Sequence, residues 1–248
     1  MSKLTWDLSG DRKYSTGVDR GVLYPRSGSR YLKGEAWNGL ISVSENPSGG
    51  EATALYADNT KYLNLMSVEE LGLGIEAYDY PEGFSACLGM TPLDDGIYIC
   101  QQEKKHFGFV YRTLEGNDTE GTKYGYDLHV IFDCVASPSE ESNSTVNDSP
   151  EANTNSWDVN TVPINIDEER KSASMTLGLR AFSDIGLYNV FKSIENILYG
   201  TEETEPSMLK PANVLELIET EKYLMDSSGN PILDDTGNKM LTTSYWNR

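Results

Sequence analysis

The sequence predicts a mainly β protein with one flanking α-helix. Residues 36–80 alternate apolar and polar side chains almost throughout, which is the side-chain period of a pleated strand. Turn signals rich in Asn, Asp, Pro, Ser and Gly interrupt that stretch at 38–39, 46–50 and 58–59. The best helical pattern is at residues 185–199, where apolar side chains recur every three or four positions.

The composition points to an acidic chain with much of its length at surfaces. The 248 residues include 39 Asp and Glu against 20 Lys and Arg, which gives a formal net charge of -19. Such a surface repels DNA, RNA and anionic lipid, so it argues against a protein that grips phosphates. The apolar content of 38% lies below the roughly 45–50% of an average globular domain. One or two domains fit this length.

The sequence shows no signal-peptide pattern, no membrane-spanning run and no cysteine spacing typical of disulfide or zinc sites. The N-terminus has no apolar segment typical of a signal peptide, and no run approaches about 18 apolar residues. Cys87, Cys100 and Cys134 have no C-x-x-C spacing, so they predict neither a disulfide framework nor a zinc site. We expect them to act as small, buried or half-buried hydrophobic residues.

The first forty residues predict an arm, a short strand and one ambiguous turn. Residues 1–20 are expected to form a polar arm, and residues 21–24 a strand that Pro25 ends. Asn38-Gly39 favours a tight hairpin, because a type I′ turn needs positive φ at both central residues. One continuous strand with a bulge at Gly39 is the competing interpretation.

A clearer hairpin follows. Residues 52–57 and 61–66 alternate on either side of Asp58-Asn59-Thr60, which is typical of two strands and a turn. The next strand is expected at residues 73–80, with Leu73, Ile75 and Ala77 on one face.

Beyond residue 80 the pattern alternates between loops and strands. Loops are expected at 81–96 and 114–123, the latter as a long polar hairpin loop, and a disordered or long connection at 137–155. The remaining strands are expected at 96–101, 107–113, 124–135, 157–166 and 172–180.

The predicted helix has start and stop signals of its own. Ser183-Asp184 is expected as its N-cap, and Gly200 as its stop. An apolar stripe along one face is expected to pack on the sheet, and it consists of Leu187, Phe191, Ile194 and Leu198.

The character of the chain changes after residue 201. An acidic break is followed by an expected short helix at 213–223 and by two near copies, MDSSGNPIL and LDDTGNKML. Their Asp…Gly-Asn turns predict a small hairpin arm, and the spacing of a complete EF-hand is missing. We therefore divide the chain into residues 1–201 and a C-terminal extension, residues 202–248.

Nothing in the pattern indicates catalysis or a bound metal or cofactor. The chain lacks the common nucleophile, zinc-protease, P-loop and dinucleotide-binding motifs. His106 and His129 flank one predicted hairpin, but no carboxylate pair completes a ligand set. Adjacent acidic residues in a strand point to opposite faces, so Asp94-Asp95 and similar doublets are poor acid–base pairs. We expect a protein that is not an enzyme.

Six stretches, several of them long, carry a resemblance to a known family: TGVDRGVLYP at 16–25, AWNGLISVSENPSGGEATALYADNTKYLNLMSVEELG at 36–72, IEAYDYPEGFSACLG at 75–89, YRTLEGNDTEGTKYGYDLHVIF at 111–132, SPSEESNSTVNDSPEA at 137–152 and ILYGT at 197–201. In them the chain resembles the major tail protein, or tail tube protein, of long-tailed bacteriophages and prophages. The likeness covers residues 14–201 and leaves the C-terminal extension outside it.

This resemblance implies a tail-tube-type β-sandwich or barrel with a flanking helix, a long inter-subunit hairpin and flexible arms. Such subunits assemble into rings, expected to be hexameric, that stack into a hollow tube. The tube encloses a tape-measure protein, meets tail-tip and terminator proteins, and passes DNA without specific binding. The implied location is the virion, after assembly in the bacterial cytoplasm, with no membrane partner.

The resemblance also directs attention to two groups of residues. An acidic lumen would keep DNA mobile, because it offers no cations to exchange for phosphate counterions. For the lumen we predict the acidic face of residues 35–80: Glu35, Glu45, Glu69, Glu70, Glu76 and Asp79. For ring stacking we predict loop 46–51 or loop 114–123, through Asn46, Pro47, Gly49, Gly50, Glu115, Asn117, Asp118 and Glu120.

Other functions fit parts of the pattern. One alternative is another virion component, such as a tail terminator or a tube-like part of a phage-derived particle. A single closed ring would favour the terminator, whereas open stacking would favour the tube. A carbohydrate-binding β-sandwich would use the chain's many tyrosines, exposed together on one loop face. A hydrolase acting through an acidic doublet has the least support.

Overall fold

A computed structural model describes residues 4–94, 96–138, 145, 152–166, 170–184 and 187–222. The fold of this part of the chain is mainly β, as the sequence predicts, with four helices. None of these helices is long and apolar enough to cross a membrane.

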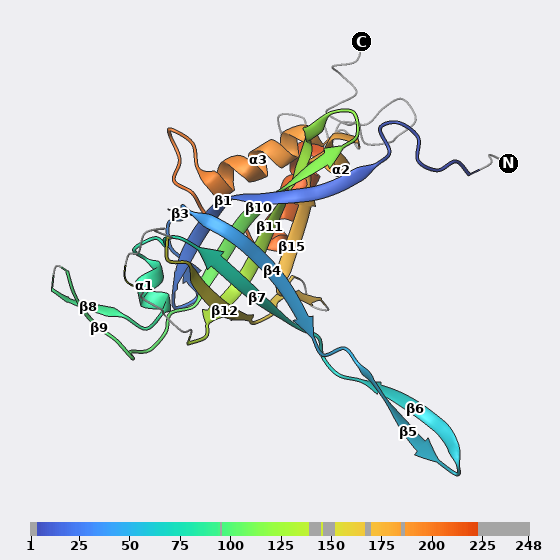
Figure 1. The fold of residues 1–248 in the computed structure, drawn as a ribbon, viewed down its shortest axis with the longest axis horizontal. Coiled ribbons are helices and arrows are strands. Elements are labelled where there is room, and N and C mark those ends of the chain that lie inside the picture. The colour runs from blue at the N-terminus through green and yellow to red at the C-terminus, as the bar shows by residue number, and fades with distance from the viewer. Residues whose placement is uncertain are drawn as a thin grey trace.

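Most strands belong to one antiparallel sheet that curls into two packed layers (Figure 1). The strand order is β2-β1-β10-β11-β12-β7-β4, with β3 beside β1 and β15 beside β11. These strands are β1 (Lys13–Ser27), β2 (Arg30–Tyr31), β3 (Glu35–Trp37), β4 (Leu40–Ser48), β7 (Glu70–Ala77), β10 (Phe107–Asn117), β11 (Gly121–Ala136), β12 (Asn155–Thr161) and β15 (Ser174–Gly178).

Strand β11 belongs to both layers. Residues 127–131 pair with β15 and residues 134–136 pair with β12. Asp133, between them, has a φ of 46°, in the left-handed region that residues other than Gly seldom adopt. Its buried carboxylate bonds the Arg26 guanidinium and lies 2.7 Å from Nδ1 of His106. These contacts hold the distortion at which the strand turns from the first layer into the second.

Two hydrophobic cores lie on opposite sides of the first layer, which consists of β1, β10, β11 and β15. Helix α3 (Tyr188–Tyr199) covers one side, where the core includes Tyr24, Val110, Val130, Phe132, Phe191 and Ile194. The second layer, β12, β7 and β4, covers the other side, where the core includes Trp37, Ile75, Phe84, Phe107, Phe109 and Trp157. The central strands β10 and β11 are therefore buried on both faces.

The structure excludes the hairpin at Asn38-Gly39. Strand β3 pairs with β1 and strand β4 pairs with β7, so the two segments do not pair with each other. Gly39 has a φ of 74°, and its carbonyl accepts a hydrogen bond from the Tyr78 amide. The turn directs the backbone from β3, which pairs with β1, into β4, which pairs with β7. Of the two interpretations, the one with an irregularity at Gly39 is closer to this arrangement than the hairpin.

The second predicted hairpin is confirmed and leaves the body of the molecule. Strands β5 (Ala52–Ala57) and β6 (Thr60–Met66) form their own two-stranded sheet, which projects from the ends of β4 and β7 (Figure 1). Asp58 and Asn59 both have positive φ, at 50° and 60°, as a type I′ turn requires. We call residues 52–66 the hairpin arm.

Three expectations near the first layer are wrong in extent. Pro25 does not end its strand but pairs with Phe107 inside β1, which also includes residues 13–20 of the predicted arm. The loop expected at 114–123 is mostly strand, because β10 and β11 pair until Asn117 meets Gly121. The loop expected at 81–96 contains helix α1 (Phe84–Cys87) and strand β8 (Thr91–Asp94), which pairs with β9 (Ile97–Ile99).

The helical region begins differently from the prediction. Ser183 and Asp184 do not cap α3, because they end a separate helix, α2 (Leu179–Asp184), in which the Ser183 hydroxyl donates to the Leu179 carbonyl. Helix α3 follows Leu187 without a side-chain cap, and Gly200 ends it as predicted. The predicted stripe is confirmed as core, with all four of its residues buried: Leu187, Phe191, Ile194 and Leu198.

The chain after residue 201 packs against the same helix before it leaves the described part. Helix α4 (Pro211–Lys222) lies where a short helix was expected. Met208, Leu209 and Val214 are buried in the core beneath α3. Strands β13 (Ile164–Asn165) and β14 (Lys171–Ser172) form a separate small pair. The Asp…Gly-Asn copies and most of the connection at 137–155 lie outside the described residues.

Candidate functional site

The outward face of the second layer is a polar surface that follows directly from strand alternation. Residues paired directly opposite each other share a face, and Leu73, Ile75 and Ala77 point inward. The intervening positions therefore point outward. We call this surface the polar sheet face, and it consists of Ser42, Ser44, Asn46 and Ser48 on β4, Glu70, Gly72, Gly74 and Glu76 on β7, and Ser156, Asp158 and Asn160 on β12.

The polar sheet face is acidic and nearly free of large side chains. It has three carboxylates, Glu70, Glu76 and Asp158, and no Lys, Arg or aromatic residue. The Ser42 hydroxyl donates to Glu76 over 2.9 Å. A Cβ at Gly74 would lie 2.7 Å from Ser44 Oγ, so Ser44 would have to shift if a larger residue replaced this glycine. Such a surface offers no cation to form an ion pair with a phosphate and no aromatic ring on which a base could stack.

Only two of the six predicted lumen residues, Glu70 and Glu76, lie together on the polar sheet face. Glu45 points into the space between the layers, where it accepts a 2.7 Å hydrogen bond from the Tyr111 hydroxyl. Glu35 accepts the Gly83 amide over 2.9 Å, and Asp79 accepts the Tyr80 amide over 2.8 Å. Glu69 is exposed just before β7 begins. The structure thus does not gather the six carboxylates on one face.

Asp158 is a member of this face that the sequence prediction missed. It pairs with Gly74 across β7 and β12, and it is exposed between the buried Trp157 and Val159. The alternation of Trp157, Asp158, Val159 and Asn160 contained the signal for its orientation. The pattern could not show that β12 lies beside β7, because this pairing joins residues about eighty positions apart in the sequence.

The predicted stacking residues fall into two different environments. Asn46 and Pro47 pair with β7, and Gly49 and Gly50, both with positive φ, connect the sheet to the hairpin arm. The β10–β11 turn is more enclosed than a free loop. Its side chains mostly bind their own chain: Asn117 accepts the amides of Thr119 and Glu120, Asp118 accepts the Gly10 amide, and Glu120 pairs with Arg180 at 2.9 Å.

The hairpin arm presents apolar side chains to solvent on a surface that its own chain does not cover. Thr53 pairs with Leu65 and Leu55 pairs with Leu63, so these four residues share one face, which we call the leucine face. Leu55, Leu63 and Leu65 are 41%, 38% and 55% exposed. No residue of either strand is buried. An isolated two-stranded hairpin is marginally stable in water, because its apolar side chains gain little burial from pairing alone.

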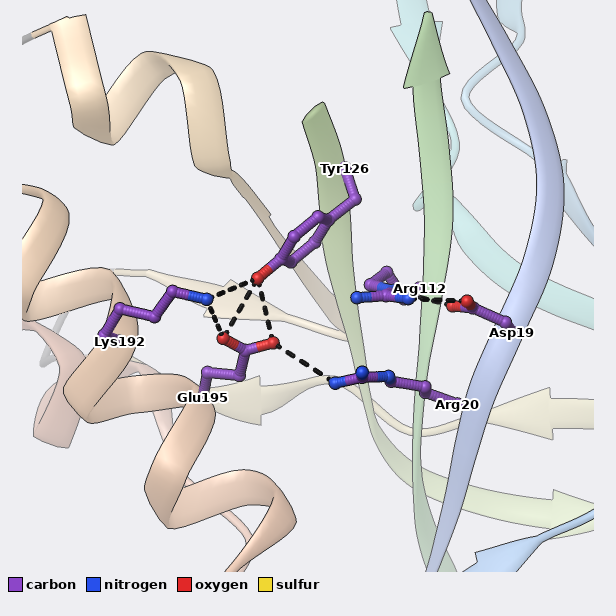
Figure 2. Close-up of polar contacts among 6 residues, drawn as sticks. All are labelled: Asp19, Arg20, Arg112, Tyr126, Lys192 and Glu195. Atoms are coloured by element: carbon purple, nitrogen blue, oxygen red, sulfur yellow. Dashed lines mark hydrogen bonds and ion pairs between the residues drawn. The ribbon is translucent and has the colours of Figure 1, made fainter. Parts of the chain in front are cut away.

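A polar network fastens α3 to the first layer on the far side from the polar sheet face (Figure 2). Glu195 and Lys192 lie one turn apart on the helix and form a 2.5 Å ion pair. The Tyr126 hydroxyl of β11 donates to both Glu195 oxygens, at 2.9 and 3.0 Å. Arg20 of β1 approaches the same carboxylate at 3.8 Å. The buried carboxylate is thus surrounded by donors from three elements.

A second ion pair extends this network across β1 and β10. Arg112 makes a two-pronged contact with Asp19, at 2.7 and 2.6 Å, and its guanidinium lies over the Tyr126 ring. Burial lowers the pKa of Lys192, but hydrogen bonds with Glu195 and Tyr126 outweigh burial and leave the pKa above its usual value. Burial raises the pKa of Tyr126. Lys192 therefore stays protonated and Tyr126 stays neutral near neutral pH.

Neither histidine belongs to a group that could hold a metal ion in the described part of the chain. His129 stacks on Tyr111 at 4.5 Å and contacts Thr113 at 2.9 Å, and burial lowers its pKa. His106 contacts Asp133 at the other end of the sheet. Antiparallel pairing therefore does not bring the two rings together. Cys87 and Cys134 are buried, whereas Cys100 is exposed.

No family model matches the chain, and no curated protein matches it.

Proposed function

We propose that this protein is the subunit of a phage tail tube, a structural virion protein that assembles into stacked rings. The polar sheet face is the observation that carries the proposal. It is acidic and free of cations and aromatic residues, so a channel wall of this composition would not hold DNA by phosphate contacts. The rings are expected to contain six copies.

Two further features support self-assembly. The hairpin arm exposes leucines that its own chain does not cover. Strand β4 pairs only with β7 among the described strands, which leaves its other edge available for pairing with a neighbouring copy. Pairing between copies would protect these edges, because a closed ring of strands has none. The tape-measure protein, tail-tip proteins and terminator are the further partners of this assembly.

The lumen assignment can be tested by the chemical accessibility of one position on the polar sheet face. A Ser44→Cys variant, with Cys100→Ser to remove the exposed thiol, is assembled and then treated with a small maleimide or with a bulky polyethylene-glycol maleimide. We expect the small reagent to react and the bulky one to be excluded from assembled tubes, while both react with the free subunit.

Any other reactivity of Ser44→Cys would assign the polar sheet face to a different part of the tube. Reaction of both reagents in the tube would place Ser44 on the outside, and protection from both would bury it between subunits. A matched position, Glu203→Cys in the same background, lies in an exposed segment after α3 and shows whether the bulky reagent reaches exposed sites of the tube. If the exposed control reacts and Ser44→Cys reacts equally, the lumen assignment fails.

A further inference from the structure

The turn between β3 and β4 contains the one Asn-Gly pair of the sequence, Asn38-Gly39 (Figure 1). Both residues are exposed. They line a groove of about 650 Å³, whose wall also includes residues of β1 and β4. Water therefore reaches the side chain of Asn38 and the backbone of Gly39.

No other contact occupies the two groups of this pair that can react with each other. Within the described part of the chain, the Asn38 side chain makes no hydrogen bond and the Gly39 amide donates none. Gly39 has no Cβ to crowd its nitrogen, and its φ of 74° lies in the region that favours glycine. The side-chain amide of Asn38 is thus adjacent to a backbone nitrogen that is both unhindered and unbonded.

Other asparagines of the described chain lack this combination. Asn46 precedes Pro47, which has no backbone N–H. Asn59 is exposed in a turn, but it precedes Thr60, whose branched side chain crowds the backbone nitrogen. Asn117 is buried, and its side-chain oxygen accepts two backbone amides. Asn38 is therefore the asparagine whose surroundings least oppose attack by the next backbone nitrogen.

We propose that Asn38 is a modification site at which the chain converts spontaneously to aspartate and isoaspartate. The Gly39 nitrogen attacks Cγ of Asn38, and a cyclic imide forms as the new N–Cγ bond replaces the Cγ–Nδ2 bond. Ammonia leaves with the proton of the Gly39 amide. Water then opens the ring. Opening at Cγ gives aspartate, and opening at the backbone carbonyl gives isoaspartate, in which the chain runs through Cβ and Cγ.

The surrounding structure makes the isoaspartate product a local disruption, because the turn is held on both sides of the reacting bond. Before it, the buried Trp37 donates from its indole nitrogen to the Asp79 carbonyl over 2.9 Å. After it, the Gly39 carbonyl accepts the Tyr78 amide over 2.9 Å. Isoaspartate adds one atom to the backbone between these two points, so one of the two contacts must move.

A displaced Gly39 also disturbs the start of β4. Leu40 pairs with Ala77 of β7 and packs on the backbone of β1, where a Cβ at Gly21 would lie 2.2 Å from Cδ1 of Leu40. The isoaspartate form is therefore expected to unfold at a lower temperature than the fresh chain. The aspartate form should change less, because its backbone keeps the original length. This inference does not depend on the tail-tube proposal.

The test is incubation of the purified chain at mildly alkaline pH, followed by tryptic digestion and fragmentation in a mass spectrometer. Cleavage after Lys33 and Lys61 leaves Asn38, Asn46 and Asn59 in one peptide, so the last two are internal controls. We expect Asn38 to become an acid several-fold faster than Asn59, with isoaspartate among the products, as isoaspartate-specific methylation would show. The isolated peptide, incubated in parallel, gives the rate without the fold.

Two results would overturn the assignment of Asn38. One is an intact Asn38 in the folded chain while the isolated peptide reacts, and the other is equal conversion of Asn38 and Asn59.

The variant Asn38→Ser tests the structural consequence. It should fold like the parent chain, because the Asn38 side chain is exposed and unbonded, and it should form no product at this position. After incubation, the unfolding temperature of the parent chain should fall and that of the variant should not. An incubated parent chain that is rich in isoaspartate but unfolds like fresh protein would show that the turn tolerates the longer backbone, which would overturn this consequence.

Discussion

The two long hairpins of this molecule, β5–β6 and β10–β11, have similar alternating sequences and opposite environments. Strands β10 and β11 lie at the centre of the sheet, with α3 on one face and the second layer on the other. The hairpin arm pairs only with itself, and none of its strand residues is buried. Alternation thus sets the local conformation of a hairpin, while its position in the fold decides what its apolar side chains do.

The difference separates stability from assembly. Apolar side chains in β10 and β11 stabilise the monomer, because folding removes them from water. Apolar side chains in the arm remain in water in the monomer and can lower the free energy only in a complex. Substitutions in the two hairpins should therefore affect different measurements.

The largest loss of stability is expected from Phe109→Ala. Phe109 of β10 is fully buried and contacts the Trp37 and Tyr111 rings. Removing the ring leaves a cavity in the core between the layers, and we expect the free energy of unfolding to fall by about 3–5 kcal/mol. Denaturant unfolding of the unassembled subunit measures this. A loss of stability no greater than that caused by Leu55→Ala in the arm would contradict the assignment of stability to the buried hairpin.

The next largest loss of stability is expected where the β10–β11 hairpin meets α3. Glu195→Ala leaves Tyr126 and Lys192 without the buried carboxylate that they bond, at an expected cost of about 1–3 kcal/mol. Glu195→Gln retains the shape and an acceptor oxygen, so it should lose less. Unfolding of the two variants side by side measures this, and equal losses would show that the charge alone matters.

A smaller, pH-dependent effect is expected from Asp127 of β11. Burial, followed by the charge of Glu115, raises its pKa from 3.8 to about 6. Protonation therefore favours the folded state, and the stability that it contributes is full below the unfolded pKa and is lost as pH rises through about 6. Asp127→Asn should be more stable than the parent chain above this pH, and the gap should close toward about pH 4.

Thermal unfolding across that pH range measures the gap. Glu115→Gln should narrow the pH dependence, because it removes the neighbouring negative charge. A gap between Asp127→Asn and the parent chain that stays constant with pH would exclude this carboxyl as its origin.

The smallest effect on stability is expected in the hairpin arm. Leu65→Ser replaces a residue of the leucine face that is more than half exposed, so the free energy of unfolding should change by no more than about 0.5 kcal/mol. Assembly should nevertheless be weakened, which sedimentation at matched concentration would show. Asn64→Ser, on the other face of the same strand, should assemble normally. If Leu65→Ser reduced both the free energy of unfolding and assembly, the arm would be part of the unit that folds cooperatively.

Local features were predictable where the chemistry of a few neighbouring residues decides the conformation. Asp58-Asn59 produced the expected turn with positive φ, and Gly200 ended the helix whose apolar stripe packs as expected. Asn38-Gly39 shows the limit of this reasoning. There the same turn residues connect β3, which pairs with β1, to β4, which pairs with β7. Both partners are distant in sequence, so the local pattern could not specify them.

The candidate surface was only partly predictable for the same reason. Glu70 and Glu76 share a face because they lie six positions apart in one strand. Glu45 was assigned to the lumen together with them, yet its register opposite Leu73 turns it inward to Tyr111. Asp158 joins the surface through a pairing with β7 that no local pattern could specify. The network around Glu195 likewise joins residues from β1, β10, β11 and α3.

The most direct test of the tail-tube proposal is electron microscopy of the purified protein as its concentration is raised. We expect hollow tubes of uniform diameter with regular ring striations, and we expect Leu65→Ser to prevent them at concentrations where Asn64→Ser forms them. A chain that remains monomeric at every concentration, or that stops at a single closed ring, would contradict the proposal of a stacked tube.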